Sequence, residues 1–259
     1  MPRMVVEGAV TLNVDGAFYN PRMRLNRDVG VAMARALEVT DYLDALAASG
    51  ARGLRVAKEA GVSSVALNDV SPRAVALIKE NARLNGREGC EILSSNANVL
   101  LHQRHFEAVD LDPFGSPAPF IAAAARSAQS YLFITATDTA PLCGAHLKSG
   151  IRKYMAVPVK AEHHREMGAR ILLGAVAREL ARVDKGMRPL LTHASDHYVR
   201  TYLGVERGAK SADRTLESMG YIEQCRSCGL WRTVLGMGCR SSGECSFCGG
   251  RADMAGPLW

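Results

Sequence analysis

The sequence predicts an α/β fold in which a doubly wound parallel sheet is followed by a smaller C-terminal unit. Three observations support this prediction. Residues 39 to 136 alternate short apolar runs with stretches of helical periodicity, which is typical of parallel strands joined by helices. Five of the seven cysteines crowd into residues 225 to 248, beyond that region. The 259 residues are 47% hydrophobic and 22% charged, which suits one globular domain with a small appendage.

Strands and helices are expected to alternate along the first part of the chain. The predicted strands are residues 39–46, 64–67, 91–93, 108–111 and 131–135. The predicted helices are residues 53–60, the segment from Ser71 to Asn85, residues 117–129 and residues 162–183. Ser71 and Pro72 supply an N-cap and a first-turn proline for the second of these helices, and Asn85-Gly86 ends it.

A second, smaller unit is expected to begin near residue 188. Residues 162–183 carry apolar side chains at helical spacing, and residues 190–206 then have the composition of a strand. We therefore expect a first domain over residues 1–187 and a smaller unit, which contains the cysteine cluster, over residues 188–259.

A glycine loop and an acidic residue mark the expected ligand site, because doubly wound sheets bind ligands at the carboxyl ends of their strands. Gly50 and Gly53 let the backbone approach a ligand closely. Ala48 stands where a dinucleotide-binding fingerprint has its first glycine, which disfavours an NAD-linked oxidoreductase. Asp69, nineteen residues after Gly50, is placed to accept the hydroxyls of a ribose or, alternatively, to cap the helix that begins at Ser71.

The fourth predicted strand ends in Asp112-Pro113-Phe114, an acid followed by a proline and an aromatic residue. Proline has no amide donor, which leaves carbonyl groups free to accept hydrogen bonds. The aromatic ring can stack on a planar base. A carboxylate, a carbonyl group and a ring at one strand end form a clamp for an aromatic amine, which donates two hydrogens.

The cysteine cluster has the spacing of a metal site. Cys225, Cys228, Cys245 and Cys248 form two CxxC pairs separated by sixteen residues. Four thiolates at this spacing suit tetrahedral zinc in a closed structural site, which would hold together a unit without a large core. Cys239 lies between the pairs and is an alternative fourth ligand. Four arginines near the cluster either touch phosphates or form an ordinary solvated surface: Arg226, Arg232, Arg240 and Arg251.

These motifs resemble those of the tRNA (guanine-N2) dimethyltransferases that act on guanosine 26 of tRNA and use S-adenosylmethionine (SAM). Asp112-Pro113-Phe114-Gly115 also resembles the Asp/Asn-Pro-Pro-Tyr-type motif of amino-group methyltransferases. The resemblance covers nearly the whole chain in order. Its matching stretches are residues 7–8, 18–21, 26–28, 44–55, 68–71, 112–120, 135–140, 153–154, 170 and 197–200.

The resemblance implies a Rossmann-like SAM-dependent methyltransferase domain, with residues 1–36 completing the active site, and a smaller C-terminal zinc-binding unit. It implies that SAM is held by a set of seven residues, Arg27, Asp44, Gly50, Arg52, Asp69, Asn96 and Ala97. Arg27 would meet the methionine end of SAM, and Asp69 would hold the ribose. The family usually has an aspartate where this chain has Asn96, at the position that meets the adenine amine, so we expect weaker SAM binding.

The resemblance also implies the catalytic residues Asp112, Pro113, Phe114 and Phe18. Asp112 and a backbone carbonyl would orient the N2 amine of guanine, while the two phenylalanines flank the base. The products would be N2-methyl- and N2,N2-dimethylguanosine at position 26 of tRNA. An Asp112 carboxylate that lies far from the cofactor cleft, or is held in an internal ion pair, would contradict this mechanism. Asp138 would either support the pocket or cap a helix.

The expected partner is tRNA, with which the net charge of +6 agrees. No stretch approaches the roughly 18 apolar residues of a membrane span and the N-terminus lacks a secretory signal, so we expect a cytoplasmic monomer without a membrane partner. Two alternatives stay open, an amino-methyltransferase that acts on another RNA or on DNA, and a non-catalytic zinc-ribbon RNA-binding protein. Typical family members continue beyond the stretch that resembles Gly256-Pro257-Leu258-Trp259, so we expect a truncated form.

Overall fold

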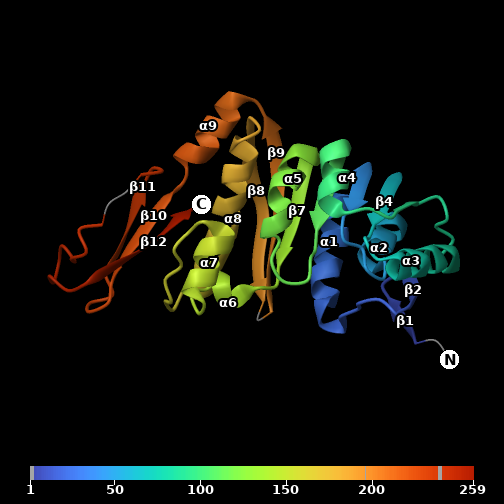
Figure 1. The fold of residues 1–259 in the computed structure, drawn as a ribbon, viewed down its shortest axis with the longest axis horizontal. Coiled ribbons are helices and arrows are strands. Elements are labelled where there is room, and N and C mark those ends of the chain that lie inside the picture. Colours follow the sequence, from blue (N-terminus) through green and yellow to red (C-terminus); the bar gives the residue numbers. More distant parts are fainter. Residues whose placement is uncertain (1–2, 196, 239–240) are drawn as a thin grey trace. The chain divides into compact units, whose positions relative to one another are not determined.

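A computed structural model describes residues 3–195, 197–238 and 241–259 (Figure 1). The chain divides into two compact units. The first comprises residues 1–113 and 126–134, and the second comprises residues 114–125 and 135–259. The predicted boundary near residue 188 falls inside a strand of the second unit and stays a prediction.

The first unit is built on five parallel strands in the order β5-β4-β3-β6-β7. Their bounds are Asp41–Asp44 for β3, Ser64–Asn68 for β4, Glu91–Leu93 for β5, Phe106–Leu111 for β6 and Ala128–Ala136 for β7. The chain moves outward from β3 to β5 and then returns to β6, on the other side of β3. The α/β alternation predicted from the sequence is confirmed, and the order of these five strands is that of a doubly wound sheet.

In the first unit, helices precede or join these strands. They are α1 (Arg24–Ala36), α2 (Ala51–Glu59), α3 (Pro72–Leu84) and α4 (Ala97–Gln103). The predicted ends of α3 are confirmed, because the Ser71 hydroxyl accepts a hydrogen bond from the amide of Ala74, and Asn85 is the C-cap. Helix α4 was not predicted from the sequence; it has only seven residues and begins after the asparagine cap Asn96.

An antiparallel hairpin of β1 (Met4–Glu7) and β2 (Val10–Asn13), followed by a short 3-10 helix at Pro21–Met23, completes the first unit. Two asparagine side chains, one within α3 and one at its C-cap, form hydrogen bonds with the backbone of β2. Asn81 exchanges hydrogen bonds of 2.8 and 3.0 Å with the backbone of Asn13, and Asn85 exchanges bonds of 2.9 and 2.7 Å with that of Thr11. These four bonds satisfy the backbone of an edge strand and fix the N-terminal segment on the α/β domain.

The second unit contains helices around an antiparallel hairpin and a separate three-stranded sheet. The helices are α5 (Ala118–Ser127), α6 (Thr139–Leu142), α7 (Leu147–Tyr154), α8 (His164–Ala181) and α9 (Ala209–Glu217). The strands are β8 (Lys185–Ser195) and β9 (Tyr198–Arg207) of the hairpin, and β11 (Trp231–Leu235), β10 (Gly220–Cys225) and β12 (Ala252–Leu258) of the sheet. The predicted strand at 190–206 is therefore two strands.

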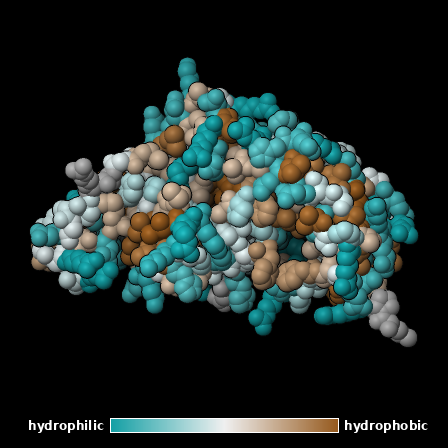
Figure 2. Space-filling view, in the orientation of Figure 1, coloured by the Kyte–Doolittle hydropathy of each residue, from teal (hydrophilic) through white to brown (hydrophobic). Residues whose placement is uncertain are grey.

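Hydrophobic and hydrophilic residues alternate in small patches over the visible face of the molecule (Figure 2). Among the described residues, no helix has both the length and the apolar composition needed to cross a membrane.

Candidate active site

Three carboxylates gather at the carboxyl edge of the parallel sheet. Asp44 is the last residue of β3, while Asp69 and Asp112 directly follow β4 and β6. Because β4, β3 and β6 are adjacent and parallel, these strand ends lie at one edge, where doubly wound sheets bind their ligands. The structure therefore brings together the acids that the sequence analysis selected.

The loop after β3 is tied to the end of β4 by Asp69. Its Oδ2 accepts a hydrogen bond of 2.9 Å from the amide of Ala48, and its Oδ1 accepts one of 2.8 Å from the amide of Ser71. Asp69 thus supports the start of α3, as the second interpretation proposed, although Ser71 is the cap. Ala48 has a φ of 49°, in the left-handed region that favours glycine, so the position behaves like the glycine it replaces. Gly50 follows with a φ of 79°.

Asp44 is buried beneath this loop and accepts a 3.0 Å hydrogen bond from the amide of Gly53. Gly53 is needed for close packing, because a Cβ atom there would lie 2.7 Å from Cδ2 of Leu67. Burial raises the pKa of the Asp44 carboxyl to about 7, and the negative charge of Asp110 adds to the rise while Arg52 opposes it. Asp44 therefore changes its charge near neutral pH.

Arg52 connects α2 to the end of β6. It is buried, and its Nη2 donates a 2.5 Å hydrogen bond to Oδ1 of Asn26 and forms an ion pair with Oδ2 of Asp112. The Asp112 carboxylate is thus held in an internal ion pair, one of the two outcomes that would contradict the proposed mechanism. The ion pair uses one oxygen only. Within the part of the chain that the structure describes, Oδ1 of Asp112 makes no hydrogen bond, and the side chain is 21% exposed. A catalytic role for Asp112 therefore has to use Oδ1.

Arg27 belongs to a buried ionic network around Glu7. Its Nε and Nη2 each donate a 2.6 Å hydrogen bond to the Glu7 carboxylate, which also accepts bonds from Tyr19 at 2.7 Å and Arg55 at 3.0 Å. Burial alone would raise the pKa of Glu7, but these donors lower it to about 2. The network fastens β1 to α1 and α2. The contact between Arg27 and the methionine end of SAM stays a prediction.

The aromatic candidates are strongly exposed. Phe18, between β2 and the 3-10 helix, is 60% exposed, and Phe114, directly after Pro113, is 89% exposed. Exposed aromatic rings are free of packing on one face and can stack on a base. Their role at the target base stays a prediction.

The four predicted zinc ligands lie together in the second unit. The thiol sulfurs of Cys225, Cys228, Cys245 and Cys248 all lie within 4.8 Å of one another. Cys225 Sγ is 3.5 Å from Cys248 Sγ, and Cys228 Sγ is 3.7 Å from Cys245 Sγ. Cys239, the alternative ligand, lies outside the described residues, as does Arg240. Arg226 and Arg232 form ion pairs with Asp253 and Glu223.

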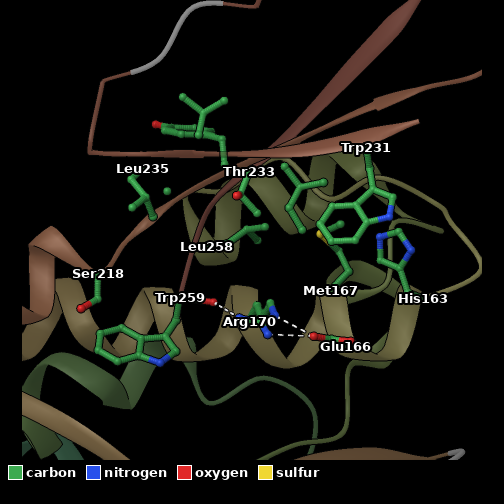
Figure 3. Close-up of a pocket in the computed structure, with 14 residues that line it drawn as sticks. His163, Glu166, Met167, Arg170, Ser218, Trp231, Thr233, Leu235, Leu258 and Trp259 are labelled. Carbon is green, nitrogen blue, oxygen red and sulfur yellow. Dashed lines mark hydrogen bonds and ion pairs between the residues drawn. The ribbon is translucent and has the colours of Figure 1, made fainter. Parts of the chain in front are cut away.

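A groove of about 430 Å³ in the second unit contains none of the predicted site residues (Figure 3). Its apolar lining includes Trp231, Met167 and Leu258, and Arg170 and Glu166 form an ion pair at its floor.

Comparison with known proteins identifies the family of this chain. The family model for N2,N2-dimethylguanosine tRNA methyltransferase matches residues 2–259. The chain belongs to this family. It is 50% identical to a tRNA (guanine(26)-N(2))-dimethyltransferase of Methanosarcina mazei over 99% of this chain and 73% of that protein. It is 44% identical to the Archaeoglobus fulgidus protein of the same name over 98% of this chain and 72% of that one.

Among solved structures, Trm1 from Pyrococcus horikoshii in complex with S-adenosyl-L-methionine superposes with a TM-score of 0.92 at 38% identity. The match covers 99% of this chain and 73% of that chain. Membership of the dimethylguanosine methyltransferase family was predicted from the motifs and is confirmed.

One departure from the family motif lies at Asn96, the N-cap of α4. Its Oδ1 accepts a 2.9 Å hydrogen bond from the amide of Asn98. We predict that Asn96→Asp binds SAM about three- to tenfold more tightly, because an aspartate keeps the cap, suits the helix N-terminus and accepts a charge-assisted bond from the adenine amine. Isothermal titration calorimetry checks this. Val99→Asp, in the same helical turn, is the control, and an unchanged Kd in Asn96→Asp would contradict the assignment.

Sequence reasoning selected neither Tyr42 nor Asp110 in this dimethylguanosine methyltransferase. Both are fully buried, and the Tyr42 hydroxyl donates a 2.5 Å hydrogen bond to Oδ2 of Asp110. An acid within the apolar residues 108–111 of β6 was the signal that would have found this pair, since buried acids are rare without partners.

Asp138 occupies the N-cap position of α6, as one interpretation expected, but its side chain makes no capping hydrogen bond. Its carboxylate accepts hydrogen bonds of 2.6 Å from the Tyr154 hydroxyl and 2.9 Å from Nζ of Lys153. The Tyr154 hydroxyl is also 2.9 Å from Oγ of Ser116, two residues beyond Phe114. Asp138 thereby braces the loop that carries Phe114.

Proposed function

We propose that the protein transfers methyl groups from SAM to the exocyclic N2 of guanosine 26 in tRNA, giving N2-methyl- and N2,N2-dimethylguanosine. The observation that carries this proposal is the position of Asp112-Pro113-Phe114 at the carboxyl end of β6, beside the ends of β3 and β4. It is supported by the relatives named tRNA (guanine(26)-N(2))-dimethyltransferase and by the SAM complex of the Pyrococcus protein.

The residues at this edge fit SAM in a Rossmann-like domain. The Asp69 carboxylate accepts two hydrogen bonds from backbone amides. Because a carboxylate can accept about four, two acceptor positions remain for ribose hydroxyls. Ala97 begins α4 beside the adenine acceptor Asn96. Gly50 lies in the loop that borders the cofactor, and Asp44, Arg52 and Arg27 are assigned to the methionine end. SAM supplies an electrophilic methyl group when bound.

The chain's own residues then orient the amine. Oδ1 of Asp112 accepts one N–H of the guanine N2 group, and a backbone carbonyl at Pro113 accepts the other, which aims the nitrogen lone pair at the methyl group. Phe18 and Phe114 hold the extruded base by stacking. The proton would leave the nitrogen toward Asp112 as the N–C bond forms and the bond between the methyl group and the sulfur of SAM breaks, with S-adenosylhomocysteine as the leaving group. Alignment of the two reactants accounts for most of the acceleration.

The thiolates of Cys225, Cys228, Cys245 and Cys248 are proposed to hold one structural zinc ion. Tetrahedral zinc with Zn–S bonds of about 2.3 Å places sulfurs about 3.8 Å apart. The two sulfur pairs at 3.5 and 3.7 Å suit that spacing. Four thiolates leave no open position, so this smaller C-terminal zinc-binding unit has a structural role.

The test is a methylation assay with radiolabelled SAM and unmodified tRNA transcripts, followed by nucleoside analysis. We expect label in N2-methyl- and N2,N2-dimethylguanosine, and none when guanosine 26 is replaced by adenosine. Label in another nucleoside, or in DNA or ribosomal RNA alone, would favour the alternative amino-methyltransferase. The cytoplasmic location and the monomeric state remain predictions.

A further inference from the structure

Asp110 lies two residues before Asp112, the proposed catalytic acid. Its carboxylate is buried and has hydrogen-bonding and charged partners of its own. It pairs in register with Asp44 of β3, so the two carboxylates are neighbours on adjacent strands. Residues two apart on a strand share a face, which puts Tyr42 on the side of Asp44. The Tyr42 hydroxyl donates to Oδ2 of Asp110 at 2.5 Å, and both side chains are fully buried.

The guanidinium of Arg52 is shared between Asp110 and Asp112. Its Nη1 lies 3.8 Å from Oδ2 of Asp110, while its Nη2 pairs with Oδ2 of Asp112. Arg52 is 4% exposed and Asp110 is 0% exposed, so water screens this attraction only weakly. Two acids thus compete for one buried cation. The one with the proposed chemical role is the more exposed of the two.

We propose that Asp110 is a positioning residue for methyl transfer, which draws one end of Arg52 to itself so that Asp112 keeps Oδ1 for the guanine amine. The proposal rests on the catalytic role of Asp112 argued above. Without the charge of Asp110, both ends of the guanidinium turn to Asp112 in a bidentate pair, the geometry that arginine and carboxylate prefer. Oδ1 is then occupied and the amine loses its acceptor.

The charge of Asp110 also raises the pKa of Asp44, and this effect can be measured. Two groups of charged or polar neighbours surround the Asp44 carboxyl. Asp110 and Asp112 approach it from the end of β6, and Arg52 and the amide of Gly53 approach it from α2. The folded-state pKa of Asp44 is raised to about 7, first by burial and then by Asp110. SAM carries a net positive charge, so its affinity in the absence of tRNA is expected to rise with pH as Asp44 ionises. Asp110→Asn removes one cause of the raised pKa and moves this rise to lower pH.

The experiment compares Asp110→Asn with Asp41→Asn, a change of the same chemistry at the opposite end of β3, where Asp41 accepts a hydrogen bond from Ser64. For Asp110→Asn we expect kcat to fall at least about tenfold with little change in the KM for tRNA. The midpoint of SAM binding against pH, measured by calorimetry without tRNA, should fall by at least about half a unit. Asp41→Asn should match the wild type in both measurements.

A wild-type kcat and an unchanged midpoint in folded Asp110→Asn would overturn the proposal. If that variant fails to fold by circular dichroism, Tyr42→Phe replaces it. The Tyr42 hydroxyl stabilises the ionised form of Asp110 and fixes Oδ2, the oxygen that faces Nη1 of Arg52, so its loss weakens the attraction of Asp110 for Arg52. We expect Tyr42→Phe to lower kcat about threefold, and wild-type turnover with an unchanged midpoint of SAM binding would overturn the proposal. Asp112→Ala separates the two hypotheses. Full turnover in Asp112→Ala removes the proposed catalytic role itself, whereas an inactive Asp112→Ala beside a normal Asp110→Asn removes only the role of Asp110.

Discussion

Asp112→Ala is expected to lower kcat for tRNA methylation by at least about a hundredfold, because it removes the acceptor that orients the amine and receives its proton. SAM binding should stay nearly intact, since Arg52 keeps Asn26 and the nearby Asp110 as partners. Single-turnover kinetics with saturating SAM measure the chemical step, and calorimetry measures the SAM affinity of the same preparation.

The matched control is Asp112→Asn, which keeps an oxygen acceptor of the same size and removes the charge. If orientation of the amine makes the larger contribution to the rate, Asp112→Asn should retain more activity than Asp112→Ala. If acceptance of the proton makes the larger contribution, the two variants should be equally inactive. Near-normal turnover in Asp112→Ala would show that the carboxylate held by Arg52 is structural, and the active site would then have to be sought elsewhere.

The acids at the strand ends were predictable because residues close to them in the sequence identify each one. Asp69 follows an apolar strand at a fixed distance from Gly50, and Asp112 is followed by a proline and an aromatic residue. Parallel strands of a doubly wound sheet then bring such positions to one edge without further information. The core strands were predictable for the same reason, since their apolar runs are bounded by turn residues.

The partners of these acids were not predictable. The pairing of Arg52 with Asp112 joins residues 60 positions apart, and that of Tyr42 with Asp110 joins residues 68 apart. Both depend on which strands become neighbours, and on which direction a long side chain takes. The sequence also did not reveal that Arg27 would be held by Glu7, since an arginine assigned to a ligand and one in an ionic network have the same local sequence.

Removal of the zinc ligands is expected to have the largest effect on the second unit. Cys228→Ser should abolish stoichiometric zinc binding and unfold the β11-β10-β12 sheet locally. Four residues of β11 out of the five, Trp231, Arg232, Thr233 and Leu235, are exposed, so apolar burial contributes little to this strand. Structural zinc sites of this type contribute on the order of 10 kcal/mol to the folded state. Zinc content by mass spectrometry and limited proteolysis within residues 225–251 measure the two effects.

Two single-cysteine controls sharpen this prediction. Cys90→Ser changes a cysteine of the first unit, outside the cluster, and should leave both zinc content and proteolysis unchanged. Cys239→Ser tests the alternative fourth ligand. It should retain one zinc per chain if the set is Cys225, Cys228, Cys245 and Cys248, whose sulfurs already lie within 4.8 Å of one another. Loss of zinc in Cys239→Ser together with its retention in Cys228→Ser would reverse the assignment, because a closed tetrahedral site has room for four thiolates and no fifth.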